Sequence, residues 1–116
     1  MEAEQYNRAD SLVRSILEQH PDHERALGYM IQISEERGKR ETTYQYYQQL
    51  SNREPDAFRY FAPEDVYYHT GVLAYQIGEY DEAVRYINRA QRQLSDTGST
   101  EYERMEGWKL RARAAQ

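Results

Sequence analysis

Residues 78–83, Gly-Glu-Tyr-Asp-Glu-Ala, decide the fold of this chain, because they form a tight turn between two predicted helices. Gly78 supplies the positive φ angle with which many helices end. On either side of the turn, apolar and small residues recur at helical spacing. Two of the small ones, Gly71 and Ala83, allow two antiparallel helices to approach closely. Residues Glu64 to Thr97 are therefore predicted to form one helix–turn–helix unit.

The same kind of unit recurs along the chain with a period of 34 residues. Pro21-Asp22 is repeated as Pro55-Asp56, and each pair follows a segment with helical spacing. A second unit runs from Glu24 to Ala57, with Gly38 at its turn. Its apolar positions are Leu27, Met30, Ile31, Tyr47 and Leu50. Because stacked units bury faces that a single unit cannot cover, this period predicts a helical solenoid.

The remaining segments complete one predicted domain over residues 1–116. Residues 1–23 match the second helix of a partial repeat, residues 58–63 are an insertion between the two units, and residues 100–114 form a capping helix. The first and last helices are predicted from residues that recur at helical spacing, namely Ala9, Val13, Ile16, Leu17, Tyr102, Met105, Trp108, Leu110 and Ala112. We expect no strand and about six helices, near residues 2–19, 24–37, 41–53, 64–77, 80–95 and 100–114.

The unit from Glu64 to Thr97 resembles a tetratricopeptide repeat. The residues at the signature places of that family are Tyr67, Gly71, Gly78, Tyr80, Ala83, Ile87 and Ala90. The unit from Glu24 to Ala57 is similar, but it departs from the family at Arg40 and Thr43, where an aromatic residue and an alanine are usual. The resemblance covers roughly residues 9 to 97. It implies an all-α solenoid of antiparallel helix pairs and a non-catalytic scaffold for protein–protein interaction.

The resemblance also implies a place for the partner, because members of the family generally bind extended or helical peptides on a concave groove lined by the first helix of each pair. Mapped by position, the groove residues are Arg25, Tyr29, Gln32, Tyr68, His69, Val72, Tyr75 and Gln76. Tyrosine rings and glutamine amides suit a sequence-tolerant peptide site. The alternative is that some of these rings pack between helices.

Composition and spacing argue against several other functions. The net charge of −5 disfavours nucleic acid as a partner, and no apolar run approaches the length of a membrane span. His20 and His23 flank a proline turn without a recognisable third ligand, so we expect neither a metal site nor a cofactor. Adjacent acids such as Glu35-Glu36 do not face each other on a helix, and we therefore expect no enzyme activity.

Two expectations concern the surface and the ends of the array. Arg85, Arg89 and Arg92 form one stripe on a second helix, which we expect to be a solvated outer face. Open solenoid ends expose apolar faces. An alternative function is therefore docking through the terminal helices, onto a larger protein or a second copy of the chain. The sequence assigns no compartment, with the cytoplasm slightly favoured, and leaves open whether a signal or anchor was removed.

Overall fold

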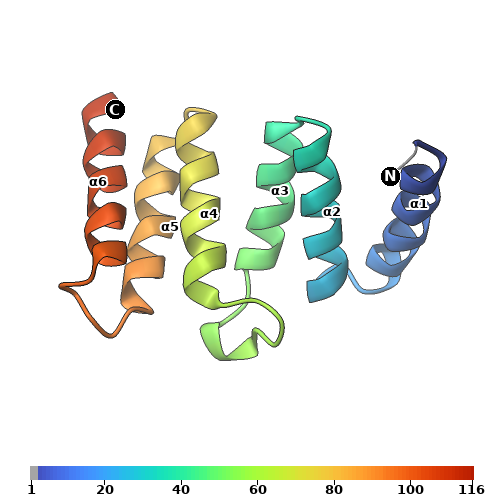
Figure 1. Ribbon diagram of the computed structural model, residues 1–116, viewed down its shortest axis with the longest axis horizontal. Helices are drawn as coiled ribbons and strands as arrows, with labels where there is room; N and C mark the ends of the chain where they lie inside the picture. The colour runs from blue at the N-terminus through green and yellow to red at the C-terminus, as the bar shows by residue number, and fades with distance from the viewer. Residues whose placement is uncertain (1–2) are drawn as a thin grey trace. The chain divides into compact units, whose positions relative to one another are not determined.

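The computed structural model describes the backbone of residues 3–116 and the side chains of residues 8–116. These residues contain no strand, and none of their helices is long and apolar enough to cross a membrane. The predicted all-α fold is confirmed. The elements, shown in Figure 1, are α1 (Ala3–Gln19), α2 (Glu24–Glu36), α3 (Arg40–Ser51), the 3-10 helix η1 (Pro55–Ala57), α4 (Pro63–Gln76), α5 (Tyr80–Arg92) and α6 (Thr100–Ala115).

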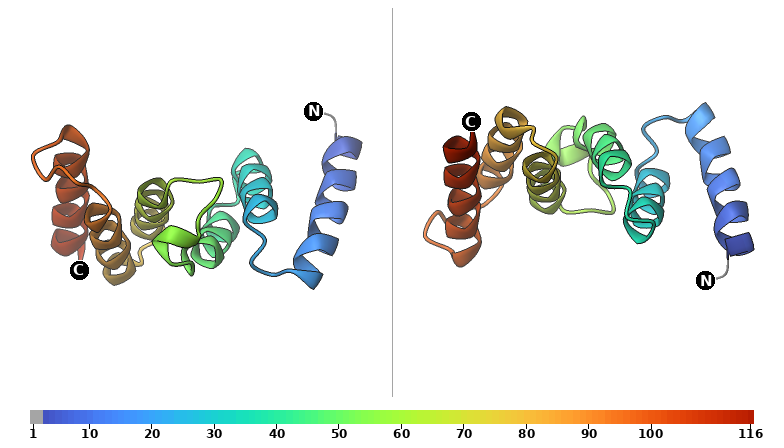
Figure 2. Two further views of the ribbon diagram at one scale, coloured as in Figure 1. Left: turned by 90° about the horizontal axis from the view of Figure 1, so that it is seen from below. Right: turned by 90° about the horizontal axis from the view of Figure 1, so that it is seen from above.

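The chain divides into two compact units, Met1–Asn52 and Arg53–Gln116. The first unit holds α1 to α3, and the second holds η1 and α4 to α6. Within each unit the helices pack in chain order, α2 against α1 and α3, and α5 against α4 and α6 (Figure 2). This stacking of helices confirms the predicted solenoid class. The boundaries drawn for the repeats, and their union in one domain, stay a prediction.

Each complete helix pair turns at a glycine in the left-handed region. Gly38 has φ 69° and Gly78 has φ 89°. At both turns the glycine N–H donates to the carbonyl three residues back, and the next N–H donates to the carbonyl five residues back. A side chain at either position would be strained, so the turns predicted at these two glycines are confirmed.

The contact between α4 and α5 is closest at Gly71. A Cβ atom placed there would lie 2.7 Å from the Cδ1 of Ile87 and 3.2 Å from the carbonyl oxygen of Ala83. Ile87 is only 1% exposed and so has little room to move aside. The small residue predicted at this position is therefore required by the distance between the helices.

In the first unit, the corresponding contact between α2 and α3 is polar. Ser34 and Thr43 lie at the same distances from Gly38 as Ala74 and Ala83 do from Gly78. The Thr43 hydroxyl donates toward the Ser34 oxygen at 2.7 Å and the Lys39 carbonyl at 2.9 Å, and Ser34 donates to the Ile31 carbonyl at 3.0 Å. Hydrogen bonds thus satisfy the buried hydroxyls where the sequence departs from the repeat pattern.

The insertion lengthens the connection before α4, and Tyr67 on α4 holds that connection in place. The Tyr67 hydroxyl donates to the Arg53 carbonyl at 2.9 Å, and the ring of Phe58 meets the Tyr67 ring edge to face at 5.9 Å. The Arg89 guanidinium lies 4.1 Å from the centre of the same ring. The expectation of a solvated outer face is therefore wrong for Arg89: this residue is half-buried, because its cation packs on an aromatic face.

The predicted helix ends need small corrections. Helix α5 ends at Arg92, three residues early, because Gln93 and Leu94 donate to carbonyls only three residues back, which tightens the last turn. Two predicted packing residues are exposed, Ile16 at 40% and Leu110 at 62%. Both lie on faces of terminal helices that no other helix of the described chain covers. Residue 2, the predicted start of the first helix, lies outside the described residues.

Candidate functional site

The residues predicted to line a groove lie on α2 in the first unit and on α4 in the second. On α2, Arg25 and Gln32 are exposed and Tyr29 is half-buried. The Gln32 amide reaches the Glu36 carboxylate along the same helix at 3.5 Å. These α2 residues present polar groups and one partly covered ring to solvent.

On α4, the predicted aromatic residues contact Trp108 of α6. Tyr68 and Tyr75 are both half-buried. The Trp108 indole N–H donates to the Tyr68 hydroxyl at 3.0 Å, and the Tyr75 ring meets the Trp108 ring edge to face at 5.4 Å. Tyr68, Val72 and Trp108 also pack against a buried cluster that includes Met105. The rings therefore pack between helices and still keep part of their surface open.

Further side chains extend this group of rings. Tyr80 at the start of α5 packs on Tyr75, with ring centres 5.5 Å apart, and the exposed His69 lies 5.5 Å from the Tyr68 ring. The Arg111 guanidinium lies 5.0 Å from the centre of the Trp108 ring. We call the four rings of Tyr68, Tyr75, Tyr80 and Trp108 the aromatic surface.

The aromatic surface offers ring faces together with a few polar groups. Because the Tyr68 oxygen accepts the Trp108 bond, its own O–H can donate to another acceptor. The exposed amide of Gln76 follows Tyr75 on α4, and Arg111 adds a cation. Groups of these kinds suit apolar or aromatic side chains and peptide carbonyls.

Trp108 was predicted as a packing residue of a capping helix, and its part in the candidate site was missed. The position of its helix in the chain could have predicted this role. Helix α6 follows the second helix of a pair, so by position it is itself a first helix. A first helix would be expected to line the same face as α4.

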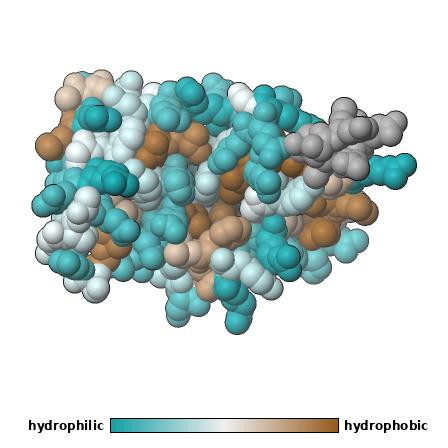
Figure 3. Space-filling view, viewed as in Figure 1, coloured by the Kyte–Doolittle hydropathy of each residue, from teal (hydrophilic) through white to brown (hydrophobic). Residues whose placement is uncertain are grey.

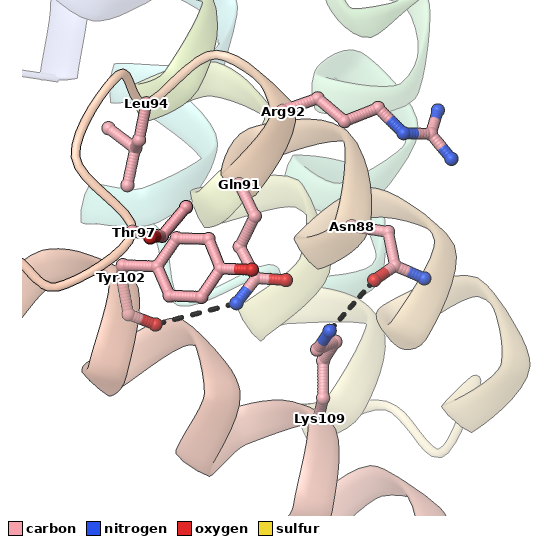
Figure 4. Close-up of a pocket in the computed structure, with 7 residues that line it drawn as sticks. All are labelled: Asn88, Gln91, Arg92, Leu94, Thr97, Tyr102 and Lys109. Atoms are coloured by element: carbon pink, nitrogen blue, oxygen red, sulfur yellow. Dashed lines mark hydrogen bonds between the residues drawn. The ribbon is translucent and has the colours of Figure 1, made fainter.

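A pocket of about 480 Å³ lies between α5, α6 and the segment that joins them (Figure 4). The buried Lys109 amine contacts the Asn88 carbonyl oxygen at 2.9 Å and the Glu106 carboxylate at 2.7 Å. Gln91 donates to the same carboxylate at 2.9 Å and also reaches the Tyr102 carbonyl at 3.4 Å. The pocket is lined by Asn88, Gln91, Arg92, Leu94, Thr97, Tyr102 and Lys109.

Lys109, Asn88, Gln91 and Glu106 form one connected set of polar contacts at this pocket. Hydrogen bonds from Lys109 and then Gln91 lower the pKa of Glu106. Because these four groups pair with one another, they fasten α6 to α5. The helical spacing of Gln91 and Lys109 with the buried residues Ile87, Met105 and Ala112 is the signal from which these contacts could be predicted.

His23 caps α2 through its ring. Its Nδ1 accepts a hydrogen bond from the Ala26 N–H at 3.1 Å, and the residue stands at the N-cap position. Within the described residues, no group of three or more His, Asp or Glu side chains lies close enough to hold a metal ion. The ring of His23 is thus explained by helix capping.

Comparison with known proteins places the chain in a family. A search of curated proteins found no match. The family model described as the TT21 fifth ARM repeats domain matches residues 1–106, which include α1 to α5 and the first part of α6. ARM (armadillo) repeats are helical repeats related to the tetratricopeptide repeats, and domains of this kind are commonly used for protein–protein interaction. The chain therefore belongs to the ARM repeat family that this model describes.

Proposed function

We propose that this chain is a non-catalytic scaffold that binds a peptide or a helical segment of a partner protein on its aromatic surface. The common use of ARM repeat domains in protein–protein interaction supports this function. The 34-residue spacing of Pro21 and Pro55 supports helix pairs of the tetratricopeptide type within this array. The observation that carries the proposal is the half-open cluster of rings fixed by the bond between Trp108 and Tyr68.

A fixed cluster of rings binds at low entropic cost. Tyr68, Tyr75 and Trp108 hold one another in place across α4 and α6. Side chains that are already ordered lose little freedom when a ligand binds, so more of the contact energy remains as affinity. Tyrosine and tryptophan are also the residues that most often dominate binding energy in protein interfaces.

The polar groups around the rings define the kind of partner. The Tyr68 O–H and the Gln76 amide can donate to backbone carbonyls, and the Arg111 cation favours an acidic residue near the edge. The expected ligand is an extended or helical segment with an apolar or aromatic anchor and a nearby carboxylate. Arg25, Tyr29 and Gln32 on α2 are a second set of candidate contacts in the first unit.

The test separates binding from folding. Replacing Tyr68 or Tyr75 by alanine would remove rings that pack on Trp108 and would therefore also weaken the fold. The double variant Tyr68→Phe with Gln76→Ala keeps every ring and removes two polar groups of the surface, one of which is the oxygen that accepts the Trp108 N–H. Its matched control, Tyr60→Phe with Gln45→Ala, makes the same chemical changes at exposed residues of the 53–62 connection and α3.

Peptides displayed on phage are selected on the unmodified protein, and the best binder is measured by calorimetry. The loss of two hydrogen bonds to the peptide, together with the bond that holds Trp108 on Tyr68, should weaken binding at least about tenfold in the surface variant. The control should bind as the unmodified protein does. If the surface variant and the unmodified protein bind every selected peptide with equal affinity, the aromatic surface is ruled out as the binding site.

A second candidate function, docking through the terminal helices, is favoured by three exposed apolar residues. Leu12 is 68% exposed, Ile16 is 40% exposed and Leu110 is 62% exposed. They lie on α1 and α6, the first and last helices that the structure describes.

A further inference from the structure

The pocket between α5 and α6 contains two polar groups that the contacts between these helices do not use. The Lys109 amine has three N–H bonds, and two of them are directed at the side-chain oxygen of Asn88 and at Oε1 of Glu106. The Gln91 nitrogen, Nε2, donates to the same Glu106 oxygen and to the Tyr102 carbonyl. Among the described residues, this leaves one N–H of Lys109 and the carbonyl oxygen of Gln91, Oε1, for a ligand.

These two groups are close together and held in place, although both residues are buried. Lys109 is 8% exposed and Gln91 is 6% exposed. Their nitrogen atoms contact one oxygen of Glu106, at 2.7 and 2.9 Å. Figure 4 shows the Lys109 amine and the Gln91 carbonyl oxygen turned toward the pocket between the helices. A donor and an acceptor that are already ordered by other bonds bind a ligand at low entropic cost.

The other walls of the pocket offer apolar contact. Leu94 and the ring of the half-buried Tyr102 line it beside the polar groups. On the face of the molecule shown in Figure 3, hydrophobic residues likewise lie in patches between hydrophilic ones. The volume of about 480 Å³ falls within the range of roughly 300–1,000 Å³ that is usual for ligand sites. A fitting ligand therefore carries a group that both donates and accepts, next to an aliphatic group.

We propose that this pocket binds a peptide group of a partner protein together with the aliphatic side chain beside it. The peptide carbonyl accepts the remaining N–H of Lys109, and the peptide N–H donates to Oε1 of Gln91. A carboxylate fits less well, because it brings no N–H to Gln91 and would approach the like charge of Glu106, which lies 2.7 Å from the amine. This second site shares no residue with the aromatic surface, and its existence does not depend on peptide binding there.

Three small compounds with the same isobutyl group test the chemistry. N-methylisovaleramide carries one peptide-type amide, methyl isovalerate has an ester oxygen in place of the N–H, and isovalerate is the carboxylate. For a ligand of about eight non-hydrogen atoms, the amide should bind with a dissociation constant on the order of 10 mM. The ester and the carboxylate should each bind at least about fivefold more weakly, because they give the Gln91 oxygen no donor. Binding is measured by the NMR shifts of the backbone amides of Gln91, Leu94 and Lys109.

Two variants test the place of binding. Lys109→Met removes the amine and should weaken binding of the amide at least about fivefold; circular dichroism checks its fold, because Lys109 also fastens α6 to α5. Thr97→Phe leaves these polar contacts intact and fills the pocket from an exposed lining residue, with the same expected loss. The matched control, Ser95→Phe, adds the same ring at an exposed residue that does not line the pocket and should bind as the unmodified chain does.

The expected result is a set of saturable shifts that Thr97→Phe loses and Ser95→Phe keeps. Equal binding of the amide and the ester, or tighter binding of the carboxylate, would overturn the assignment of a peptide group. No saturable shift at amide concentrations about ten times the expected dissociation constant would rule out the pocket as a ligand site. A shift of the Trp108 indole N–H alone would place the amide on the aromatic surface instead, and would likewise overturn the second site.

Discussion

At the scale of single residues, two glycines inside helices have different roles. Gly71 lies against Ile87 and the Ala83 carbonyl, where even one added methyl group would overlap atoms of α5. Gly107 faces open space. The same residue type is thus required by close packing in α4, whereas in α6 a Cβ atom at Gly107 would meet no neighbouring atom.

Replacing each glycine by alanine tests this difference. Gly71→Ala should destabilise the protein, because overpacking costs about 1–3 kcal/mol and outweighs the gain in helix propensity of about 1 kcal/mol. Gly107→Ala should leave the free energy of unfolding unchanged or raise it by up to about 1 kcal/mol. Both are measured by urea denaturation at low protein concentration. Equal stabilities of the two variants would contradict the close approach at Gly71.

Residue-scale features differ in how far the sequence predicts them. Gly71 and Gly78 could be predicted because their cause is local, a turn and the spacing around it. The contact of Arg89 with Tyr67 could not, since its partner lies on another helix and a row of arginines on one helix suits solvent equally well. Trp108 was missed as part of the site for the same reason, because its partners Tyr68 and Tyr75 lie on α4.

At the scale of helices, the two units pack their helix pairs through different kinds of residue. The α4–α5 contact uses Gly71, Ala74 and Ala83, while the α2–α3 contact buries the hydrogen-bonded hydroxyls of Ser34 and Thr43. The Lys39 carbonyl that Thr43 approaches also accepts the Thr43 backbone N–H. The main loss on removing either hydroxyl is therefore the bond between the two side chains.

A double-mutant cycle should measure that bond. Ser34→Ala and Thr43→Val are each expected to cost about 1 kcal/mol in the free energy of unfolding, and the double variant is expected to cost less than the two combined. The reason is that the second substitution removes a group that has already lost its partner. Costs that simply add would show that Ser34 and Thr43 are not coupled.

The contact between α5 and α6 should depend on pH. The bonds from Lys109 and Gln91 lower the pKa of Glu106 in the folded protein, so this carboxylate stabilises the fold above its unfolded pKa and stops doing so as the pH falls through the folded value. Glu106→Gln should thus lose less stability than the unmodified chain between about pH 7 and about pH 3, around the ordinary glutamate pKa of about 4.3.

The difference should be below about 1 kcal/mol, because the Glu106 side chain is 41% exposed and solvent screens the pair. Urea denaturation across this pH range measures it. Glu103→Gln removes an exposed carboxylate from the same helix and controls for the change in net charge. If the free energy of unfolding depends on pH in the same way in Glu106→Gln and in the unmodified chain, the Glu106–Lys109 pair has no role in stability.

The helices themselves were predictable to within a few residues, because their starts, turns and apolar spacing depend on residues that are close together in the sequence. The end of α5 was placed too late, since a tightened last turn leaves no mark in the residue pattern. The hydrogen bond from Tyr67 that holds the 53–62 connection could not be predicted either, because the fold decides which carbonyl the Tyr67 hydroxyl meets.

At the scale of the molecule, the 34-residue period predicted a helical solenoid, and the match to the ARM repeat family model agrees at the level of helical repeats. Related repeat families bury similar stripes of small and apolar residues, so one sequence can resemble more than one of them. The predicted groove could be mapped to helix faces, but how much of Tyr68 and Tyr75 stays open depends on Trp108 of α6.

Trp108 provides the most direct test of the central claim, that partners bind on the aromatic surface. It is the single tryptophan of the chain, so its fluorescence and its indole N–H resonance report on that surface alone. When a selected peptide is titrated, the account predicts a saturable change of both signals, shifted about tenfold to higher peptide concentration in the Tyr68→Phe, Gln76→Ala variant. Binding seen by calorimetry with both Trp108 signals unchanged would contradict it.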